Sequence, residues 1–257
     1  MSLPDTELTL LFEGPEPTIN VFIHGYSAVA TANQMNRLAN YILRARPQGK
    51  VYLLYWKAGD WKKSFAPPVI STTLRVFRVS RLFHPAALAA DAAVTIGLQS
   101  YQFKKKERLA ERLGQHLPEL LAQIPDIEEH QLNLFGHSLG GRAIQTALQE
   151  HHWDHLNLHD CLVMASAGDR DDYLWDHEVR KLKGSFYNIY SNNDLTLKIS
   201  PDLRSRVGRH PIPSMSDQII NIPFHEYRHT DYWPNLETIL KRSWPAYTPS
   251  EHLCTED

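Results

Sequence analysis

Cysteine is scarce in this sequence: only Cys161 and Cys254 occur among its 257 residues. Cys161 lies within an apolar run and Cys254 in the polar C-terminal tail, so their contexts give no reason to expect them to pair. Small domains that rely on disulfides carry more cysteines at regular spacings. A disulfide framework is therefore excluded, and a reducing compartment is expected.

An excess of charge of one sign is also missing. Lysine and arginine together number 27, aspartate and glutamate number 29, and the net charge is −2. This balance offers no electrostatic basis for nucleic acid as the main partner.

Long hydrophobic runs are absent as well. The N-terminal residues Met-Ser-Leu-Pro-Asp-Thr-Glu lack the basic start and apolar run of a secretion signal. The most apolar stretch, 85–98, contains Asp91 and is too short to span a bilayer. We therefore expect a cytoplasmic protein, with delivery outside the cell by a signal-independent route left open.

What the sequence does contain is an alternation of strand-like and helix-like segments. Apolar residues make up 42% and charged residues 22%, as in ordinary globular domains. The alternation predicts one α/β domain over 1–257, with a mainly parallel sheet covered by helices on both faces. Helices are expected around 35–43, 109–121 and 234–243. The predicted strands are 8–12, 18–23, 50–56, 131–136, 161–166, 185–190 and 218–222.

The segment 57–104 interrupts this alternation. It is longer than the usual connection, and long insertions in compact domains tend to be lids or binding loops. Apolar residues and arginines fall on opposite faces of a helical pattern within it. We expect a helical cap: either a helix packed on the body, or a lid over the active site. Contact of 70–98 with a membrane surface is a further hypothesis.

The strongest functional motif is Gly-His-Ser-Leu-Gly-Gly at 136–141. An apolar strand precedes it and a helical pattern follows it, as in a nucleophile elbow. A sharp turn from strand to helix would expose the hydroxyl of Ser138 at the edge of the sheet. Ser138 is therefore the predicted nucleophile.

A serine nucleophile needs a general base, and the sequence offers fourteen histidines. In this type of fold the base follows the nucleophile and the acid along the chain. His229 lies in the loop between the last predicted strand and the last helix, which favours it. His225 is the alternative because it is closer to the end of that strand.

The base in turn needs a carboxylate that orients it. Asp194 follows the predicted strand 185–190, at the strand end where the active-site loops of parallel sheets gather. Asp169, after the preceding strand, is the alternative. The order of the strands favours Asp194.

An oxyanion hole requires two backbone N–H donors. The first is expected from Leu139, the residue after the nucleophile. The second is expected from Tyr26, in the loop His24-Gly25-Tyr26 that ends an early apolar strand. His24 is interpreted as a residue that fixes this loop by hydrogen bonding.

Ile-His-Gly-Tyr at 23–26, the motif at 136–141, Asp194 and His229 together resemble the α/β-hydrolase superfamily, especially its lipase- and esterase-like members. The resemblance covers about 18–243, with 57–104 outside it. It implies an eight-stranded, mainly parallel sheet, acyl-enzyme chemistry, and no metal or organic cofactor.

The expected function is thus a serine hydrolase that cleaves carboxylic esters of lipids or small molecules. Thioesterase, amidase and acyltransferase chemistry use the same acyl-enzyme and remain alternatives, as does a hydrolase-like binding protein without turnover. A helical zinc site among His151, His155 and His159 is a weaker interpretation of their i,i+4 spacing.

Overall fold

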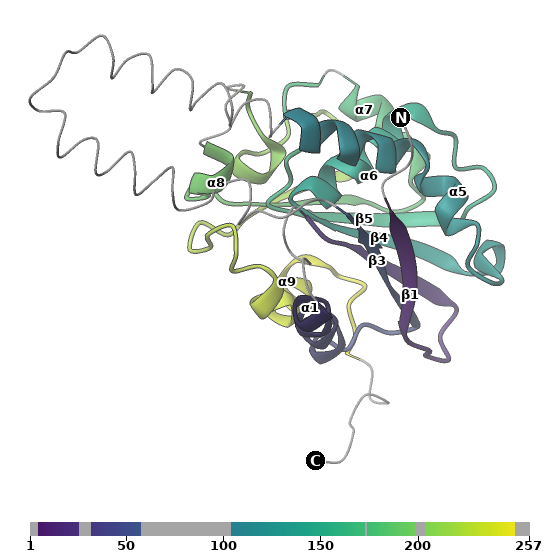
Figure 1. The fold of residues 1–257 in the computed structure, drawn as a ribbon. Coiled ribbons are helices and arrows are strands. Elements are labelled where there is room, and N and C mark those ends of the chain that lie inside the picture. Colours follow the sequence, from purple (N-terminus) through teal and green to yellow (C-terminus); the bar gives the residue numbers. More distant parts are fainter. Residues whose placement is uncertain (1–4, 26–31, 58–103, 173, 199–203, 250–257) are drawn as a thin grey trace, which may run out of the picture.

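The computed structural model describes residues 5–25, 32–57, 104–172, 174–198 and 204–249 (Figure 1). Within these ranges one seven-stranded sheet has the order β1-β3-β2-β4-β5-β6-β7. Strand β1 runs antiparallel to β3, and every other neighbouring pair is parallel. The strands are β1 (Thr6–Phe12), β2 (Thr18–Ile23), β3 (Lys50–Trp56), β4 (Gln131–His137), β5 (Leu158–Met164), β6 (Phe186–Tyr190) and β7 (Ile219–Pro223).

This mixed, mostly parallel sheet with helices on both faces is the α/β-hydrolase fold that the sequence predicted. The chain crosses from β2 to β3, returns to the centre at β4 and then moves outward to β7. The resemblance implies eight strands, whereas the described residues contain seven. A parallel sheet gathers the loops after its strands at one edge, and this edge holds the candidate site.

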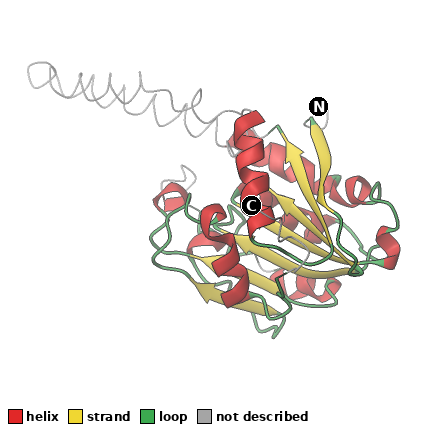
Figure 2. Ribbon diagram, turned by 90° about the horizontal axis from the view of Figure 1, so that it is seen from below, coloured by secondary structure: helices red, strands yellow, loops and turns green. Residues whose placement is uncertain are grey.

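Helices cover the two faces of the sheet in separate groups (Figures 1 and 2). Helix α6 (Leu139–Glu150) packs on β4 and β5, with α5 (Leu117–Leu121) beside it. Helices α1 (Ala32–Arg44) and α9 (Leu236–Ser243) contact each other and lie on the opposite face in Figure 1. Shorter helical segments are η2 (Ile127–Glu129), α7 (Trp175–Glu178), η3 (Val179–Lys181), α8 (Leu195–Lys198), η4 (Val207–Arg209) and η5 (Trp233–Asn235).

The predicted helix over 109–121 is in fact two pieces. Residues 104–115 are helical, His116 leaves the helical conformation with ψ 7°, and α5 begins at Leu117. Pro118 lacks the N–H that a continuous helix would use, so it fits the first turn of a new helix. Similarly, the predicted helix over 234–243 starts with the 3₁₀ turn η5.

Strand β5 was predicted at 161–166 but spans Leu158–Met164. It ends early because Ala165 has a φ of 45°, which turns the backbone away from the sheet. It begins early because the buried Asp160 can lie inside the strand, where its carboxylate has hydrogen-bond partners from other segments. Its carboxylate accepts hydrogen bonds from Trp244 Nε1 at 2.7 Å and from the N–H of Ser185 at 2.8 Å. A polar residue in the interior of a strand interrupts the apolar run by which a buried strand is recognised.

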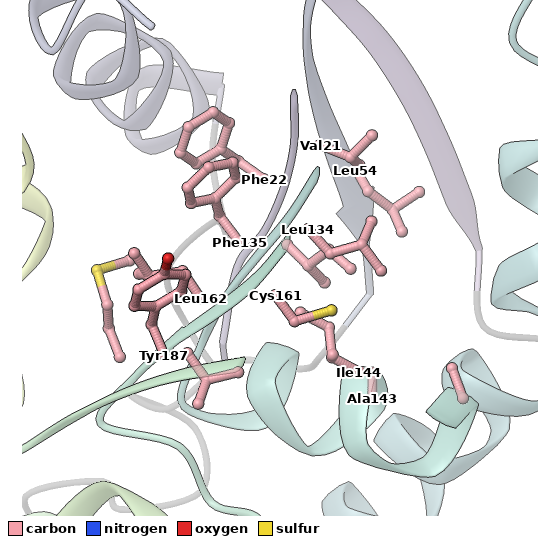
Figure 3. Packing of buried hydrophobic residues seen from close by; sticks show 14 of the residues in the cluster. Val21, Phe22, Leu54, Leu134, Phe135, Ala143, Ile144, Cys161, Leu162 and Tyr187 are labelled. Atoms are coloured by element: carbon pink, nitrogen blue, oxygen red, sulfur yellow. The ribbon is translucent and has the colours of Figure 1, made fainter. Parts of the chain in front are cut away.

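The core consists of two layers of side chains, one on each face of the sheet (Figure 3). Phe22 and Phe135 are register partners on β2 and β4, and their rings stack with centroids 4.5 Å apart. Their neighbours Val21 and Leu134 point to the opposite face, where α6 contributes Ile144 (Figure 3). Each fully buried ring contributes about 1.5–3 kcal/mol of stability relative to exposure.

The expected cap over 57–104 and the membrane-contact hypothesis for 70–98 concern residues 58–103, which lie outside the described residues. In the described part of the chain, the helices are too short or too polar to cross a bilayer.

Candidate active site

Ser138 lies at a strained turn between β4 and α6. Its φ of 55° and ψ of −117° are unfavourable for a residue with a side chain, at a cost of about 1–3 kcal/mol. The surrounding backbone holds this conformation: the N–H of Ser138 donates to the carbonyl of Met164 at 3.0 Å, and its carbonyl accepts from Ala167 at 2.9 Å. Gly140 permits the turn, because a Cβ there would lie 2.2 Å from the carbonyl oxygen of Ile23.

The imidazole of His229 lies between a hydroxyl and a carboxylate. Its Nε2 is 3.0 Å from Ser138 Oγ, and its Nδ1 is 2.7 Å from Asp194 Oδ2. An ionised carboxylate can only accept, so Nδ1 carries the proton and Nε2 is free to accept the serine proton. The structure thus joins Asp194, His229 and Ser138 through two hydrogen bonds, each within the reach that proton transfer requires.

Asp194 is fully buried, and both of its carboxylate oxygens are occupied. Oδ2 accepts from His229, while Oδ1 accepts from the N–H of Leu197 at 3.0 Å, at the start of α8. The second hydrogen bond fixes the orientation of the carboxylate.

Asp169, the alternative acid, is engaged elsewhere. Its carboxylate forms ion pairs with Arg142 at 2.9 Å, Arg204 at 3.0 Å and Arg206 at 3.1 Å. Arg206 has no exposed side-chain surface and also pairs with Glu107 at 2.7 Å. Asp169 is therefore part of a partly buried charge network that connects α6 and the helical residues 104–115 with the segments of Asp169 and Arg206.

His225, the alternative base, has an exposed side chain whose ring contacts the ring of Tyr190 with centroids 5.7 Å apart. Its backbone carbonyl accepts a hydrogen bond from Asn193 Nδ2. Ser191 Oγ donates to the carbonyl of Tyr227 at 2.7 Å. The backbone at 225 and 227 thus ties the loop of His229 to the loop that carries Asp194.

Gly25, the last described residue before the gap at 26–31, lies close to the nucleophile. A Cβ at this position would lie 2.6 Å from the Cβ of Ser138. Tyr26, the expected second oxyanion donor, lies outside the described residues. The N–H of Leu139, the expected first donor, is the first of helix α6 and has no acceptor within that helix.

His24 holds the Gly25 loop through hydrogen bonds of defined direction. Its Nε2 accepts from the N–H of Trp56 at 3.3 Å, so Nδ1 carries the proton and donates to the carbonyl of Gly25 at 2.7 Å. Trp56 Nε1 also donates to the carbonyl of His24 at 2.9 Å. Complete burial lowers the pKa of His24 to about 4, so the ring is neutral near pH 7.

His137 is a residue of the site that the sequence interpretation missed. Its Nε2 lies 3.0 Å from the backbone carbonyl of His229, across 92 positions of sequence. Burial, reinforced by the nearby His229, lowers the pKa of His137 to about 3. The only signal in the sequence was its place next to Ser138, which does not reveal a contact with a distant loop.

The histidines after α6 are used in other ways. His151 Nε2 lies 2.7 Å from the carbonyl oxygen of Gln115, and His159 Nδ1 lies 3.2 Å from Asp160 Oδ1. Among the residues that the structure describes, no three His, Cys, Asp or Glu side chains are grouped as metal ligands would be.

No family model matches the chain, and no curated protein sequence matches it. Solved structures of hydrolases are similar to it at low identity. A dienelactone hydrolase from Anabaena variabilis is 16% identical, with 96% of this chain and 99% of that chain covered and a TM-score of 0.42. The acyl-protein thioesterase 2 of Zea mays is 10% identical, with 93% and 98% covered and a TM-score of 0.47.

A lipase-esterase related protein from Clostridium acetobutylicum is 11% identical, with 92% of this chain and 97% of that chain covered and a TM-score of 0.48. Similarity at this level identifies no substrate. The assignment to the α/β-hydrolase fold follows instead from the strand order and from the turn at Ser138.

Proposed function

We propose that this protein is a serine hydrolase that cleaves carboxylic esters through an acyl-enzyme, with Ser138 as nucleophile, His229 as general base and Asp194 as the orienting acid. The observation that carries the proposal is the line of two hydrogen bonds, 2.7 and 3.0 Å long, that joins these side chains. The strained backbone of Ser138 supports it, because strain of this kind concentrates at functional sites.

In the first half of the reaction, Ser138 Oγ attacks the ester carbonyl carbon while His229 Nε2 takes the serine proton. The carbonyl oxygen becomes an oxyanion, which the N–H groups of Leu139 and Tyr26 would stabilise. His229 then returns the proton to the alkoxy oxygen, the C–O bond breaks, and the alcohol leaves the acyl-enzyme.

In the second half, water attacks the acyl carbon and His229 removes a proton from it. The second tetrahedral intermediate collapses as His229 protonates Ser138 Oγ, which releases the carboxylic acid and restores the serine. Asp194 stabilises the imidazolium in both halves, because a fully buried carboxylate 2.7 Å away interacts strongly with a positive charge.

A fluorophosphonate probe combined with a panel of p-nitrophenyl esters tests this function. The wild-type protein should be labelled on Ser138 and should hydrolyse at least one ester of the panel. Ser138→Ala should abolish labelling and lower turnover at least about 10⁴-fold. Ser243→Ala is the matched control, because Ser243 is also a buried serine but lies at the end of α9.

Labelling of wild type and Ser243→Ala but not of Ser138→Ala supports the proposal. Hydrolysis by Ser138→Ala at the wild-type rate would remove Ser138 from the mechanism. A wild-type protein that neither reacts with the probe nor turns over an ester would instead indicate a binding protein with the shape of a hydrolase.

A further inference from the structure

His137 is the polar residue of the motif 136–141 to which the proposed reaction gives no task. It is the last residue of β4, directly before Ser138, and only 6% of its surface is exposed. Polar side chains buried to this extent nearly always form a hydrogen bond. The contact of His137 is with the backbone of His229, the proposed base.

We propose that His137 is a positioning residue, whose Nε2–H anchors the carbonyl of His229 and so sets the place of the base relative to Ser138. This inference rests on the proposed function. It adds a residue to the site that neither touches the substrate nor exchanges a proton with it.

The direction of the hydrogen bond follows from its partner. A backbone carbonyl can only accept, so Nε2 of His137 carries the proton. The other ring nitrogen, Nδ1, is buried and has no hydrogen-bond partner in the described part of the chain. Within the described residues, the hydrogen bond to His229 is therefore the one that this ring makes.

The geometry ties the nucleophile and the base to one rigid element. His137 is the residue before Ser138 in the chain and holds the backbone of His229 at 3.0 Å. A shift of β4 thus moves the hydroxyl and the imidazole together. The ring also packs against those of His229, Tyr232 and Trp233, with centroid separations of 5.0, 5.8 and 5.6 Å.

Two other side chains that hold this loop bind residues other than His229. Ser191 holds the carbonyl of Tyr227, and Asn193 holds that of His225. In contrast, the bond from His137 reaches the backbone of His229 itself. A displacement of a catalytic group by about 1 Å can lower the rate roughly 100-fold, so loss of this hydrogen bond is expected to lower the rate.

The ring remains in one protonation state near neutral pH, because burial lowers the pKa of His137 to about 3. The donor is thus always available, and it is a neutral one. A positive charge beside the base, which would oppose formation of its imidazolium, is avoided.

A matched pair of variants separates the hydrogen bond from the packing. Gln and Met have similar length and volume, but only Gln carries an N–H₂ that can reach as far as Nε2 of histidine. We expect His137→Met to lower kcat and the rate of fluorophosphonate labelling about 10- to 100-fold, with KM within about threefold of wild type. His137→Gln should restore both rates to within about threefold of wild type.

His137→Asn is the second donor-deficient variant, because its amide is too short to reach the carbonyl. It should behave like His137→Met, and it retains a polar side chain if the Met variant does not fold. Thermal unfolding of each variant shows that rates are compared between folded proteins.

Wild-type labelling on Ser138, required first, distinguishes this inference from the proposed function. If wild type is labelled and His137→Met or His137→Asn reacts at the wild-type rate, the positioning role is refuted alone. The same holds if His137→Gln is as slow as His137→Met, because packing would then explain the loss. A wild type without labelling refutes the proposed function and this inference with it.

Discussion

Acidification should destabilise the protein through His24 and His137. Both rings are buried and neutral near pH 7, with pKa values lowered from 6.5 to about 4 for His24 and to about 3 for His137. In the unfolded chain both rings take a proton as the pH falls through 6.5, whereas in the folded protein they do so only near their lowered values. Stability from this source is therefore complete above pH 6.5 and is lost as the pH falls toward 4 and 3.

The magnitude follows from proton linkage. Between pH 7 and pH 5, each ring makes the unfolded state more favourable by about 2 kcal/mol, so the two together remove roughly 4 kcal/mol. Glu178 acts in the opposite direction over this range, because burial raises its pKa from 4.5 to about 7. The pH dependence of the wild-type free energy of unfolding thus contains opposing contributions. A comparison with a single-site variant is needed to measure the contribution of one ring.

Urea unfolding at pH 7, 6 and 5, followed by tryptophan fluorescence, provides that comparison. His137→Gln removes one titrating ring and keeps a hydrogen-bond donor. The difference in free energy of unfolding between this variant and wild type should shift by about 2 kcal/mol in favour of the variant from pH 7 to pH 5. His152→Gln is the control, because it removes an exposed ring.

The reasoning is refuted if the free energies of unfolding of His137→Gln and wild type, plotted against pH, run parallel from pH 7 to pH 5. Parallel curves would mean that His137 titrates alike in the folded and unfolded states, in conflict with its burial. A constant offset between the two curves carries no such meaning, because it reports only the change in packing.

Three further predictions concern single substitutions at four positions. As the pH rises from 5 to 8, Glu178→Gln should gain about 2–3 kcal/mol in free energy of unfolding relative to wild type, because the wild-type carboxyl acquires a buried charge and the amide does not. A difference in free energy of unfolding that stays constant with pH, measured by urea unfolding, contradicts this. Asp194→Asn should lower kcat about 10⁴-fold, whereas Asp169→Asn should keep kcat within a few fold and lose about 3 kcal/mol in urea unfolding. The reverse pattern would make Asp169 the acid. Gly25→Ala should lower kcat at least about 100-fold, since its Cβ would lie 2.6 Å from that of Ser138, and wild-type turnover would disprove this contact.

Much of the fold could be predicted from patterns that depend on neighbouring residues alone. Strands β2 and β3 have the predicted bounds, because both are nearly continuous apolar runs that end in turns. The place of His229 in the loop before the last helix favoured it over His225, and the order of the strands favoured Asp194 over Asp169. The hydrogen bonds of the structure join the chosen pair to each other and to Ser138.

The features that were missed depend on contacts between distant segments. The start of β5 could not be found because Asp160 is polar, and the bond to Trp244 that makes its burial favourable spans 84 positions. The contact of His137 with His229 spans 92. Asp169 could not be recognised as part of an ion-pair network, because its arginine partners lie on separate segments.

The environment of each imidazole, rather than its residue type, distinguishes the proposed base from its neighbours. The hydrogen bonds of His24 and His137 are to backbone N–H and carbonyl groups, and both rings are buried, so a positive charge on either ring is unfavourable. His229 has the fully buried carboxylate of Asp194 at 2.7 Å, which stabilises an imidazolium. The proposed base thus faces a buried carboxylate, whereas His24 and His137 remain neutral hydrogen-bond donors that hold the backbone in place.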